Sequence, residues 1–351
     1  MSIRVLIVDD SATMRAVLTQ LLGGERDIEV VGTAADAMEA RVKIKELDPD
    51  VVTLDIEMPG MSGLEFLEKL MRLRPTPVVI VSGLTQKGAD ATAQALAIGA
   101  IDCYAKPDGS AGALLKGDNG ELASRIRVAA SSRRRTPTAP LSAAPSVAAL
   151  SVAAPSAVRH GKTDLIAIGS STGGVEALQT LLTEFPEDCP PTVIVQHINA
   201  NFAGAVARRL DGLCRPRVQL ADADLPLRQG HIYFAPTNEL HFRVTGGNPG
   251  FVAKLRQGDP ISGHRPSVDA LFQSVADVAG ARAVGILLTG MGSDGANGLL
   301  AMHRAGAFTI AQDQASCTVF GMPRAAIALG AASQVLPLTQ IASRVLSMVT
   351  A

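Results

Sequence analysis

The sequence predicts an α/β protein with two doubly wound parallel sheets. Short apolar runs alternate with helical segments over residues 3–132, and a second alternating series begins at Thr163. This alternation favours parallel sheets, because parallel strands need a long crossover connection. A stretch rich in Ala, Pro and Ser separates the two series. At 351 residues the chain is also longer than an ordinary single domain, so we expect two domains.

In the first series, five strand-like runs are each followed by a helical segment. We expect strands at residues 3–9, 29–34, 51–57, 77–83 and 101–106, and helices at 14–22, 36–47, 63–73, 87–99 and 121–132. The strands are rich in Val and Ile, which is typical of parallel strands buried on both faces. The order predicts a flavodoxin-like domain over residues 1–125.

Residues 126–162 are expected to form a linker. Ala, Pro, Ser and Val dominate this stretch, and such a composition cannot bury enough apolar surface to order itself. The net charge of −1 gives no general attraction to nucleic acid, and no apolar run approaches membrane-spanning length. Four cysteines without CxxC spacing indicate neither a zinc site nor a disulfide framework. We expect a cytoplasmic protein without nucleic-acid binding or membrane insertion.

The second series, residues 163–351, predicts a Rossmann-like domain. We expect strands at 164–170, 192–197, 283–290 and 308–313, and helices at 175–185, 202–210, 267–279, 295–306, 323–330 and 338–349. Residues 231–236 and the pair 241–247 and 251–257 are expected to form an antiparallel hairpin addition.

Reactive side chains stand at strand ends of the first series. Asp9 and Asp10 end the first strand, Asp55 the third, Ser82 the fourth and Lys106 the fifth. The carboxyl ends of parallel strands meet at one edge of the sheet, where such folds bind ligands. Three carboxylates repel each other unless a divalent cation such as Mg²⁺ binds them. With a lysine and a hydroxyl, this cation can stabilise a phosphoryl group on an aspartate. The alternative is a flavodoxin-like domain whose acids are merely solvated.

These positions resemble the receiver domain of two-component response regulators. The resemblance implies that Asp55 accepts a phosphoryl group from a histidine kinase and shares Mg²⁺ with Asp9 and Asp10. It also implies that three further residues form the switch: Ser82 as the hydroxyl, Tyr104 as the rotating aromatic residue, and Lys106 before Pro107.

Three strand ends of the second series carry a second candidate site. They are Ser170–Gly174 (SSTGG), Gln196–His197, and Thr289–Gly295 (TGMGSDG). A small-residue turn between strand and helix can expose a serine hydroxyl where backbone N–H groups stabilise an oxyanion. A histidine at a neighbouring strand end can act as general base, and an aspartate can fix its tautomer. The pattern favours a hydrolase.

The residues alone leave alternatives open. STGG could instead cradle a phosphate group at a helix N-terminus, as in an output domain that binds a nucleotide or a partner without catalysis. Asp294 could be only a helix N-cap, and His264 in SGHRPSVD is a competing base.

Behind the receiver-like half, five motifs resemble the chemotaxis protein-glutamate methylesterase family (CheB): IGSSTGG, VIVQH, GHRPSVDALF, LLTGMGSDGANG and SCTVFGMPRAA. The resemblance implies a catalytic site of Ser171 as nucleophile, His197 as base and Asp294 as orienting acid, with Thr172, Met291 and Gly292 at the oxyanion and substrate. It also implies hydrolysis of γ-glutamyl methyl esters, and deamidation of glutamines, on methyl-accepting chemoreceptors. No cofactor is expected in this half. The chain departs from the family at Ile198–Ala203, where Met-Pro-Pro-Gly-Phe-Thr is typical, so we expect a less rigid loop.

Overall fold

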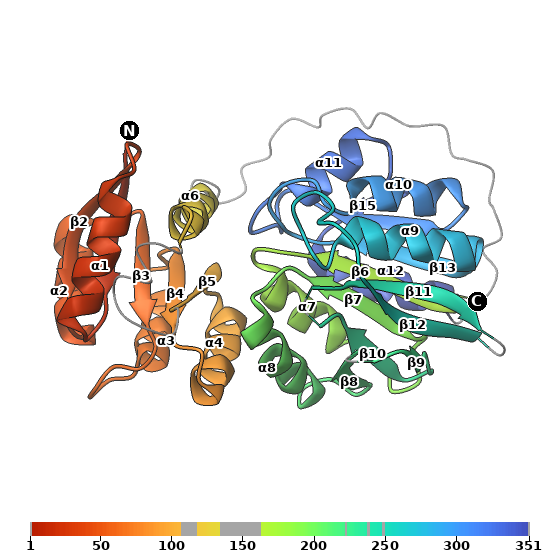
Figure 1. Cartoon of the computed structure of the whole chain (residues 1–351), viewed down its shortest axis with the longest axis horizontal. Helices are drawn as coiled ribbons and strands as arrows, with labels where there is room; N and C mark the ends of the chain where they lie inside the picture. Colours follow the sequence, from red (N-terminus) through yellow and green to blue (C-terminus); the bar gives the residue numbers. More distant parts are fainter. Residues whose placement is uncertain are drawn as a thin grey trace.

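Two α/β domains lie side by side in the computed structural model (Figure 1). The structure describes residues 2–106, 118–133, 163–221, 223–236, 239–247 and 250–349. Pro107 and residues 134–162 of the expected linker lie outside this part of the chain. In the described part, no helix has the length and apolar character needed to span a bilayer.

The first domain is a parallel sheet with the strand order β2-β1-β3-β4-β5. Its strands are β1 (Ile3–Val8), β2 (Ile28–Ala34), β3 (Val51–Asp55), β4 (Val78–Ser82) and β5 (Asp102–Ala105). Its helices are α1 (Ala12–Gly23), α2 (Ala37–Leu47), α3 (Gly63–Leu73), α4 (Gln86–Ile98) and α6 (Glu121–Arg133). The strand order reverses between β1 and β3, which places the ends carrying Asp9 and Asp55 side by side.

Helix α6 runs through the expected domain boundary at residue 125. Its apolar positions are buried against the first sheet: Leu122, Ala123, Ile126, Ala129 and Ala130. The expected helix at 121–132 is therefore present, and burial of this stripe joins residues 126–132, counted above with the linker, to the first domain. The receiver-like unit therefore reaches Arg133 in the structure.

The second domain is a seven-stranded parallel sheet with the order β15-β14-β13-β6-β7-β10-β8, beside a small antiparallel sheet β11-β12-β9. The strands are β6 (Leu165–Ser170), β7 (Thr192–Gln196), β8 (Arg217–Leu220), β9 (Leu225–Pro226), β10 (His231–Phe234), β11 (His241–Gly247), β12 (Gly250–Arg256), β13 (Ala283–Leu287), β14 (Phe308–Gln312) and β15 (Gln334–Leu336). The helices are α7 (Gly174–Leu182), α8 (Ala200–Asp211), α9 (Val268–Ala279), η1 (Gly280–Arg282), α10 (Ala296–Arg304), α11 (Met322–Ala328) and α12 (Leu338–Val349). The predicted fold class, with its antiparallel hairpin β11–β12, is confirmed.

Strand β10 belongs to the parallel sheet and not to the antiparallel addition. We expected residues 231–236 in the antiparallel addition, but β10 pairs in parallel with β7 and β8. Ile232, Tyr233 and Phe234 are all buried, so both faces of this strand are covered, as in a central parallel strand. The short strands β8 and β15 were not predicted, because three or four residues carry too little periodicity to be recognised.

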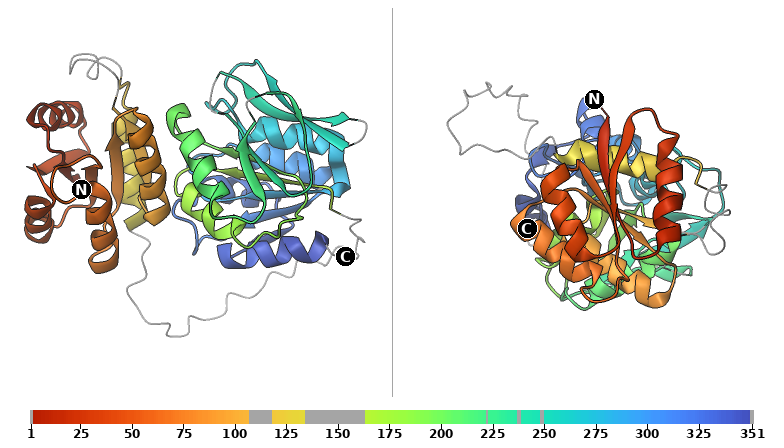
Figure 2. Two further views of the ribbon diagram at one scale, coloured as in Figure 1. Left: turned by 90° about the horizontal axis from the view of Figure 1, so that it is seen from below. Right: turned by 90° about the vertical axis from the view of Figure 1, so that its left-hand side faces the viewer.

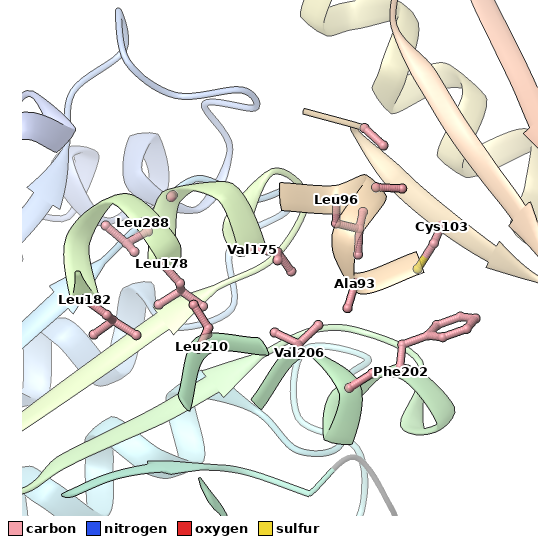
Figure 3. Packing of buried hydrophobic residues seen from close by; sticks show 14 of the residues in the cluster. Ala93, Leu96, Cys103, Val175, Leu178, Leu182, Phe202, Val206, Leu210 and Leu288 are labelled. Atoms are coloured by element: carbon pink, nitrogen blue, oxygen red, sulfur yellow. The ribbon is translucent and has the colours of Figure 1, made fainter. Parts of the chain in front are cut away.

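The domains meet through helices α4, α7 and α8. Ala93 and Leu96 of α4 face Val175 of α7 and Val206 of α8, and these four buried residues belong to one continuous apolar cluster (Figure 3). At the rim, Arg208 forms an exposed ion pair with Asp90, with Nη2 and Oδ1 2.8 Å apart. The left view of Figure 2 shows the same side-by-side arrangement, with α4 turned toward the second domain, whereas the right view looks along the line that joins the two domains. The carboxyl edge of the second sheet thus lies near the first domain.

Candidate active site

The turn after β6 separates two adjacent serines. Ser170 is fully buried, and its hydroxyl donates a hydrogen bond of 2.6 Å to Oε1 of Gln196. Ser171 lies beyond the strand end and lines an open cleft, while its backbone N–H donates to the carbonyl of Thr289 (3.0 Å). The N–H groups of Gly173 and Gly174 donate to the carbonyls of Ile101 and Ser171, so neither points to an external anion. The turn therefore presents a serine hydroxyl and does not form a phosphate cradle.

His197 and Asp294 come together across the domain. Nε2 of His197 lies 2.8 Å from Oδ2 of Asp294, which is almost completely buried. The carboxylate of Asp294 also accepts hydrogen bonds from the hydroxyl of Ser267 (2.7 Å) and from the N–H groups of Val268 (2.8 Å) and Asp269 (3.0 Å) at the start of α9. Burial alone would raise the pKa of Asp294, but the bonds to His197 and Ser267 lower it overall. This carboxylate is therefore held ionised beside the imidazole.

Asp294 does not cap its own helix. Gly295 is the N-cap of α10 and makes no side-chain capping bond, whereas Asp294 binds the N-terminus of α9 instead. The N-cap alternative is therefore wrong for α10. A carboxylate at a helix N-terminus is stabilised by the exposed N–H groups there, which accounts for its fixed orientation toward His197.

His264 lies flat against His197. The ring centroids are 3.8 Å apart and the planes differ by 8°. Burial and the neighbouring His197 lower the pKa of His264 below its ordinary value, which favours a neutral ring. Nδ1 of His197 is buried and has no hydrogen-bond partner among the described residues. His264 therefore supports the face of His197 and leaves Nδ1 available for another group in the cleft.

Gln196 is a further site residue, and its role is not evident from the sequence pattern. Its amide nitrogen Nε2 donates to the carbonyls of Ser171 (2.8 Å) and His197 (2.9 Å), and its Oε1 accepts from Ser170. One buried amide thus joins the end of β6 to the end of β7. In the sequence, only its place directly before His197 indicates that Gln196 lies near the site. That place does not show in which direction the side chain of Gln196 points.

The residues expected around the oxyanion line the same cleft. Met291 is half-exposed, and Gly292 has φ of 81°, which only glycine adopts without strain. A Cβ at Gly290 would lie 2.7 Å from Cβ of Ser171, so the backbone must approach closely here. Thr172, in contrast, donates its hydroxyl to Oδ2 of Asp102 in the first domain at 3.2 Å.

Both domains contribute to the cleft, which has a volume of about 600 Å³. The second domain supplies Ser171, Thr172, His197, His264 and Met291, and the first supplies Asp102, Asn119, Glu121, Ser124 and Arg125. Residues of β5 and α6 thus form the wall opposite the serine.

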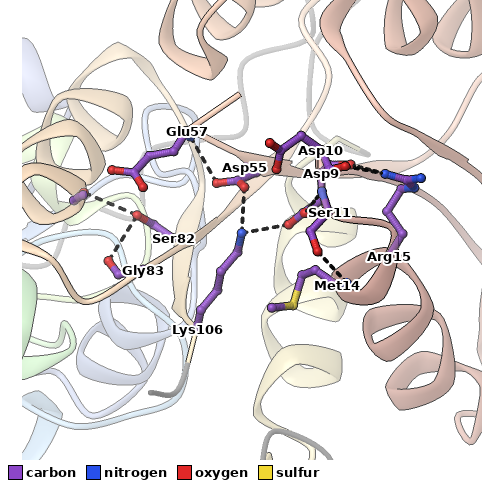
Figure 4. A network of polar contacts seen from close by, with 11 residues as sticks. Asp9, Asp10, Ser11, Met14, Arg15, Asp55, Glu57, Ser82, Gly83 and Lys106 are labelled. Atoms are coloured by element: carbon purple, nitrogen blue, oxygen red, sulfur yellow. Dashed lines mark hydrogen bonds and ion pairs between the residues drawn. The ribbon is translucent and has the colours of Figure 1, made fainter. Parts of the chain in front are cut away.

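The candidate phosphorylation site lies at the carboxyl edge of the first sheet (Figure 4). Nζ of Lys106 lies 2.7 Å from Oδ2 of Asp55 and 2.8 Å from Oδ2 of Asp9. The other oxygen of Asp55 accepts a hydrogen bond from the N–H of Glu57 at 3.1 Å. Although burial opposes its charge, the two carboxylates raise the pKa of Lys106 above its ordinary value. Lys106 therefore remains cationic between them.

The acidic residues of this edge fit a small divalent cation. Oxygens of Asp9, Asp10 and Asp55 lie within 4.8 Å of one another. Burial raises the pKa of Asp9, and the charge of Asp55 adds to this, although Lys106 opposes it. Crowded carboxylates of this kind are the hard oxygen ligands that Mg²⁺ prefers.

Ser82 and Tyr104 are both buried near this edge. The hydroxyl of Ser82 lies 3.4 Å from the carbonyls of Gly83 and Gly88. Burial and a hydrogen bond with Asp118 raise the pKa of Tyr104. Among the described residues, Lys106 is thus the expected switch residue that contacts Asp55 directly.

Two protein-family profiles match the two domains of this chain. The profile of the CheB methylesterase family matches residues 166–345, and that of the response regulator receiver domain matches residues 5–115. A protein-glutamate methylesterase/protein-glutamine glutaminase of Agrobacterium fabrum is 50% identical over 351 residues, covering 99% of this chain and 97% of that protein. The chain belongs to the CheB methylesterase family. The predicted family and class of enzyme are thereby confirmed.

Two further relatives agree with this membership. A protein-glutamate methylesterase/protein-glutamine glutaminase of Caulobacter vibrioides is 50% identical, covering 99% of this chain and 98% of that protein. The crystal structure of the Thermotoga maritima CheB methylesterase catalytic domain covers 54% of this chain and 100% of that chain, with 32% identity and a TM-score of 0.52. The likeness thus includes the fold of the second domain.

The segment that departs from the usual CheB pattern begins helix α8. Asn199 is the N-cap, and its side chain accepts a hydrogen bond from the N–H of Asn201 at 3.0 Å. Phe202 is completely buried in the apolar cluster shared by the domains. This CheB-family chain therefore keeps the buried ring of the usual pattern and has a side-chain cap where the pattern has prolines.

Proposed function

We propose that this chain hydrolyses γ-glutamyl methyl esters of chemoreceptors, deamidates receptor glutamines, and is activated by phosphorylation of Asp55. The contact of His197 with the buried carboxylate of Asp294, on the cleft wall that carries Ser171, is the main support. The names of its relatives support the substrate class.

The proposed reaction is a two-step acyl transfer. The hydroxyl oxygen of Ser171 attacks the side-chain carbonyl carbon of the methylated glutamate, and Nδ1 of His197 accepts the hydroxyl proton. Asp294 keeps the other ring nitrogen protonated and stabilises the positive ring. The tetrahedral oxyanion binds to backbone N–H groups near Met291.

Collapse of this intermediate breaks the bond to the methoxy group. His197 returns its proton to the leaving oxygen, and methanol departs, or ammonia when the substrate is glutamine. A water molecule then attacks the acyl-serine, and His197 first takes and then returns a proton. The products are free Ser171 and a glutamate carboxylate.

The proposed regulation acts on access to the cleft. The first domain covers one side through β5 and α6, so docking of the domains would restrict the approach of a receptor helix to Ser171. Mg²⁺ held by Asp9, Asp10 and Asp55 would supply the positive charge needed for phosphoryl transfer from a histidine kinase. Phosphorylation must favour the separated arrangement by about 1–3 kcal/mol for a several-fold effect.

Methanol release from methylated receptor membranes tests this proposal. We expect a basal rate that rises when Mg²⁺ and a small acyl phosphate are added. Asp55→Asn should keep the basal rate and lose both the rise and the acid-labile labelling of the chain. Labelling that persists in Asp55→Asn would exclude Asp55 as acceptor, and no methanol release with intact receptor would refute the activity.

A further inference from the structure

A groove between α2 and α3 lies on the first domain away from the catalytic cleft. It has a volume of about 660 Å³, and Ile44, Phe66 and Leu70 lie at its base. In Figure 1, α2 stands at the end of the molecule farthest from the second domain. Docking of the two domains therefore leaves the groove open.

Exposed apolar side chains gather on this groove. Leu73 is 73% exposed and Met38 is 62% exposed, the highest values among the large hydrophobic side chains of the described residues. Both line the groove, one from each helix. Isolated exposed apolar residues need no explanation, but their concentration on one concave surface is typical of a binding site.

The charged residues that line the groove are all basic. They are Arg41, Lys45, Lys69, Arg72 and Arg74, and no acidic side chain joins them in the described lining. Arg74 forms an ion pair with Asp48, at 2.7 Å between Nη2 and Oδ1. Within the described part of the chain, Arg41, Lys45 and Arg72 form no ion pair. The whole chain carries a net charge of only −1, so this concentration of positive charge is local.

We propose that this groove binds an acidic amphipathic helix of a partner protein. Apolar side chains on one face of such a helix would cover Met38 and Leu73, which is the usual mode of binding between two helices. Its carboxylates would pair with the basic residues along both walls and set the orientation. A concave surface with an apolar base accepts a row of side chains better than it accepts a flat lipid bilayer.

Methyl NMR of the full chain tests this proposal. The ten methionines would be labelled at the ε-methyl carbon, and Met38→Leu and Met61→Leu would assign the two groove signals. The probe is a synthetic helix of Leu and Glu about four turns long, and its control has Lys in place of Glu. We expect the acidic probe to shift the methyl signals of Met38 and Met61 and to leave that of Met291 unchanged. The shifts should be smaller at high salt.

The substitutions Arg41→Glu/Arg72→Glu should lower the affinity of the chain for the acidic probe by at least about tenfold. Unchanged phosphodonor labelling of Asp55 would verify that this variant is folded. Three results would overturn the proposal: no shift of the Met38 and Met61 signals, equal shifts with the Lys probe, or unchanged binding of the acidic probe by the variant. Self-association lost in Leu73→Asp, or sedimentation with phosphatidylglycerol vesicles lost in Arg41→Glu/Arg72→Glu, would also overturn it, because the occupant would then be a second copy or a membrane.

Discussion

The carboxylate of Asp102, at the first position of β5, accepts a hydrogen bond from the hydroxyl of Thr172, the residue that follows Ser171. The preceding carbonyl of Ile101 accepts the N–H of Gly173 at 3.3 Å. Arg125 of α6 holds the other oxygen of Asp102 by an ion pair. The receiver-like domain is thus tied to the turn that carries the serine, and the apolar contact of α4 is only one part of the interface.

Removing this tie should raise the basal activity. Asp102→Ala deletes a partly buried charged acceptor, and such a bond contributes about 1.5–3 kcal/mol at most. We expect a several-fold faster unphosphorylated methanol release and a smaller gain from the phosphodonor. Asp90→Ala is the matched control, because its ion pair with Arg208 is more than half exposed and should matter little. Equal basal rates of the two variants would contradict this assignment.

The two serines of the turn should differ sharply. Ser171→Ala should reduce methanol release by at least about a thousandfold while the fold survives, since members of a catalytic triad act as a unit. Ser170→Ala loses one bond to Gln196 and should cost little activity. Single-turnover methanol release measures both. If Ser170→Ala lost methanol release and Ser171→Ala kept it, Ser171 would not be the nucleophile.

Gln196→Met should lower kcat with little change in KM. The methionine fills the space but leaves the carbonyls of Ser171 and His197 without their donor. A displacement of either group should reduce kcat by about tenfold to a hundredfold. Leu178→Ala in the core of α7 is the control for lost stability alone. If both variants lose stability equally and keep the wild-type kcat, Gln196 has no positioning role.

His264 should make the second domain less stable in acid. Because its pKa in the folded state is lowered from 6.5, the unfolded chain binds this proton more tightly than the folded domain does. The contribution of neutral His264 to the free energy of unfolding is complete above 6.5, the pKa in the unfolded chain. It is lost as the pH falls through 6.5 toward the lower pKa of the folded domain. His264→Phe keeps a ring against His197 and removes the proton site. We expect a smaller loss of Tm for this variant between about pH 7.5 and about pH 5.5. A loss equal to that of the wild type would argue against a half-buried, neutral His264.

The strand ends could be predicted because period and composition locate parallel strands, and parallel strands share one carboxyl edge. Asp9, Asp55 and Lys106 meet for this reason, and Ser171 and His197 line one cleft for the same reason. The contact of Asp294 with the start of α9 depended on side-chain direction, which the sequence pattern does not contain. The same limit applies to the amide of Gln196 and to the ring of His264.

The boundary at residue 125 and the sheet of β10 differ from the structure for two other reasons. The helix at 121–132 was predicted from its own pattern, but its last residues were also counted with the Ala/Pro/Ser-rich linker that follows. Burial against the first sheet places them with the receiver-like domain. Residues 231–234 lie close in sequence to a hairpin but pair with β7 and β8 in parallel. For β10, tertiary contacts overrode the local pattern.

Docking of α4 against α7 and α8 also occupies that surface of the receiver-like domain. Any protein that recognises the outer face of α4 competes with the catalytic half for it. Such a protein binds only the separated arrangement. Docking of the two domains weakens its binding, and by linkage its binding disfavours the docked arrangement by the same free energy. Under the proposed regulation, a competitor for this face would therefore act as an activator without touching Asp55 or Ser171.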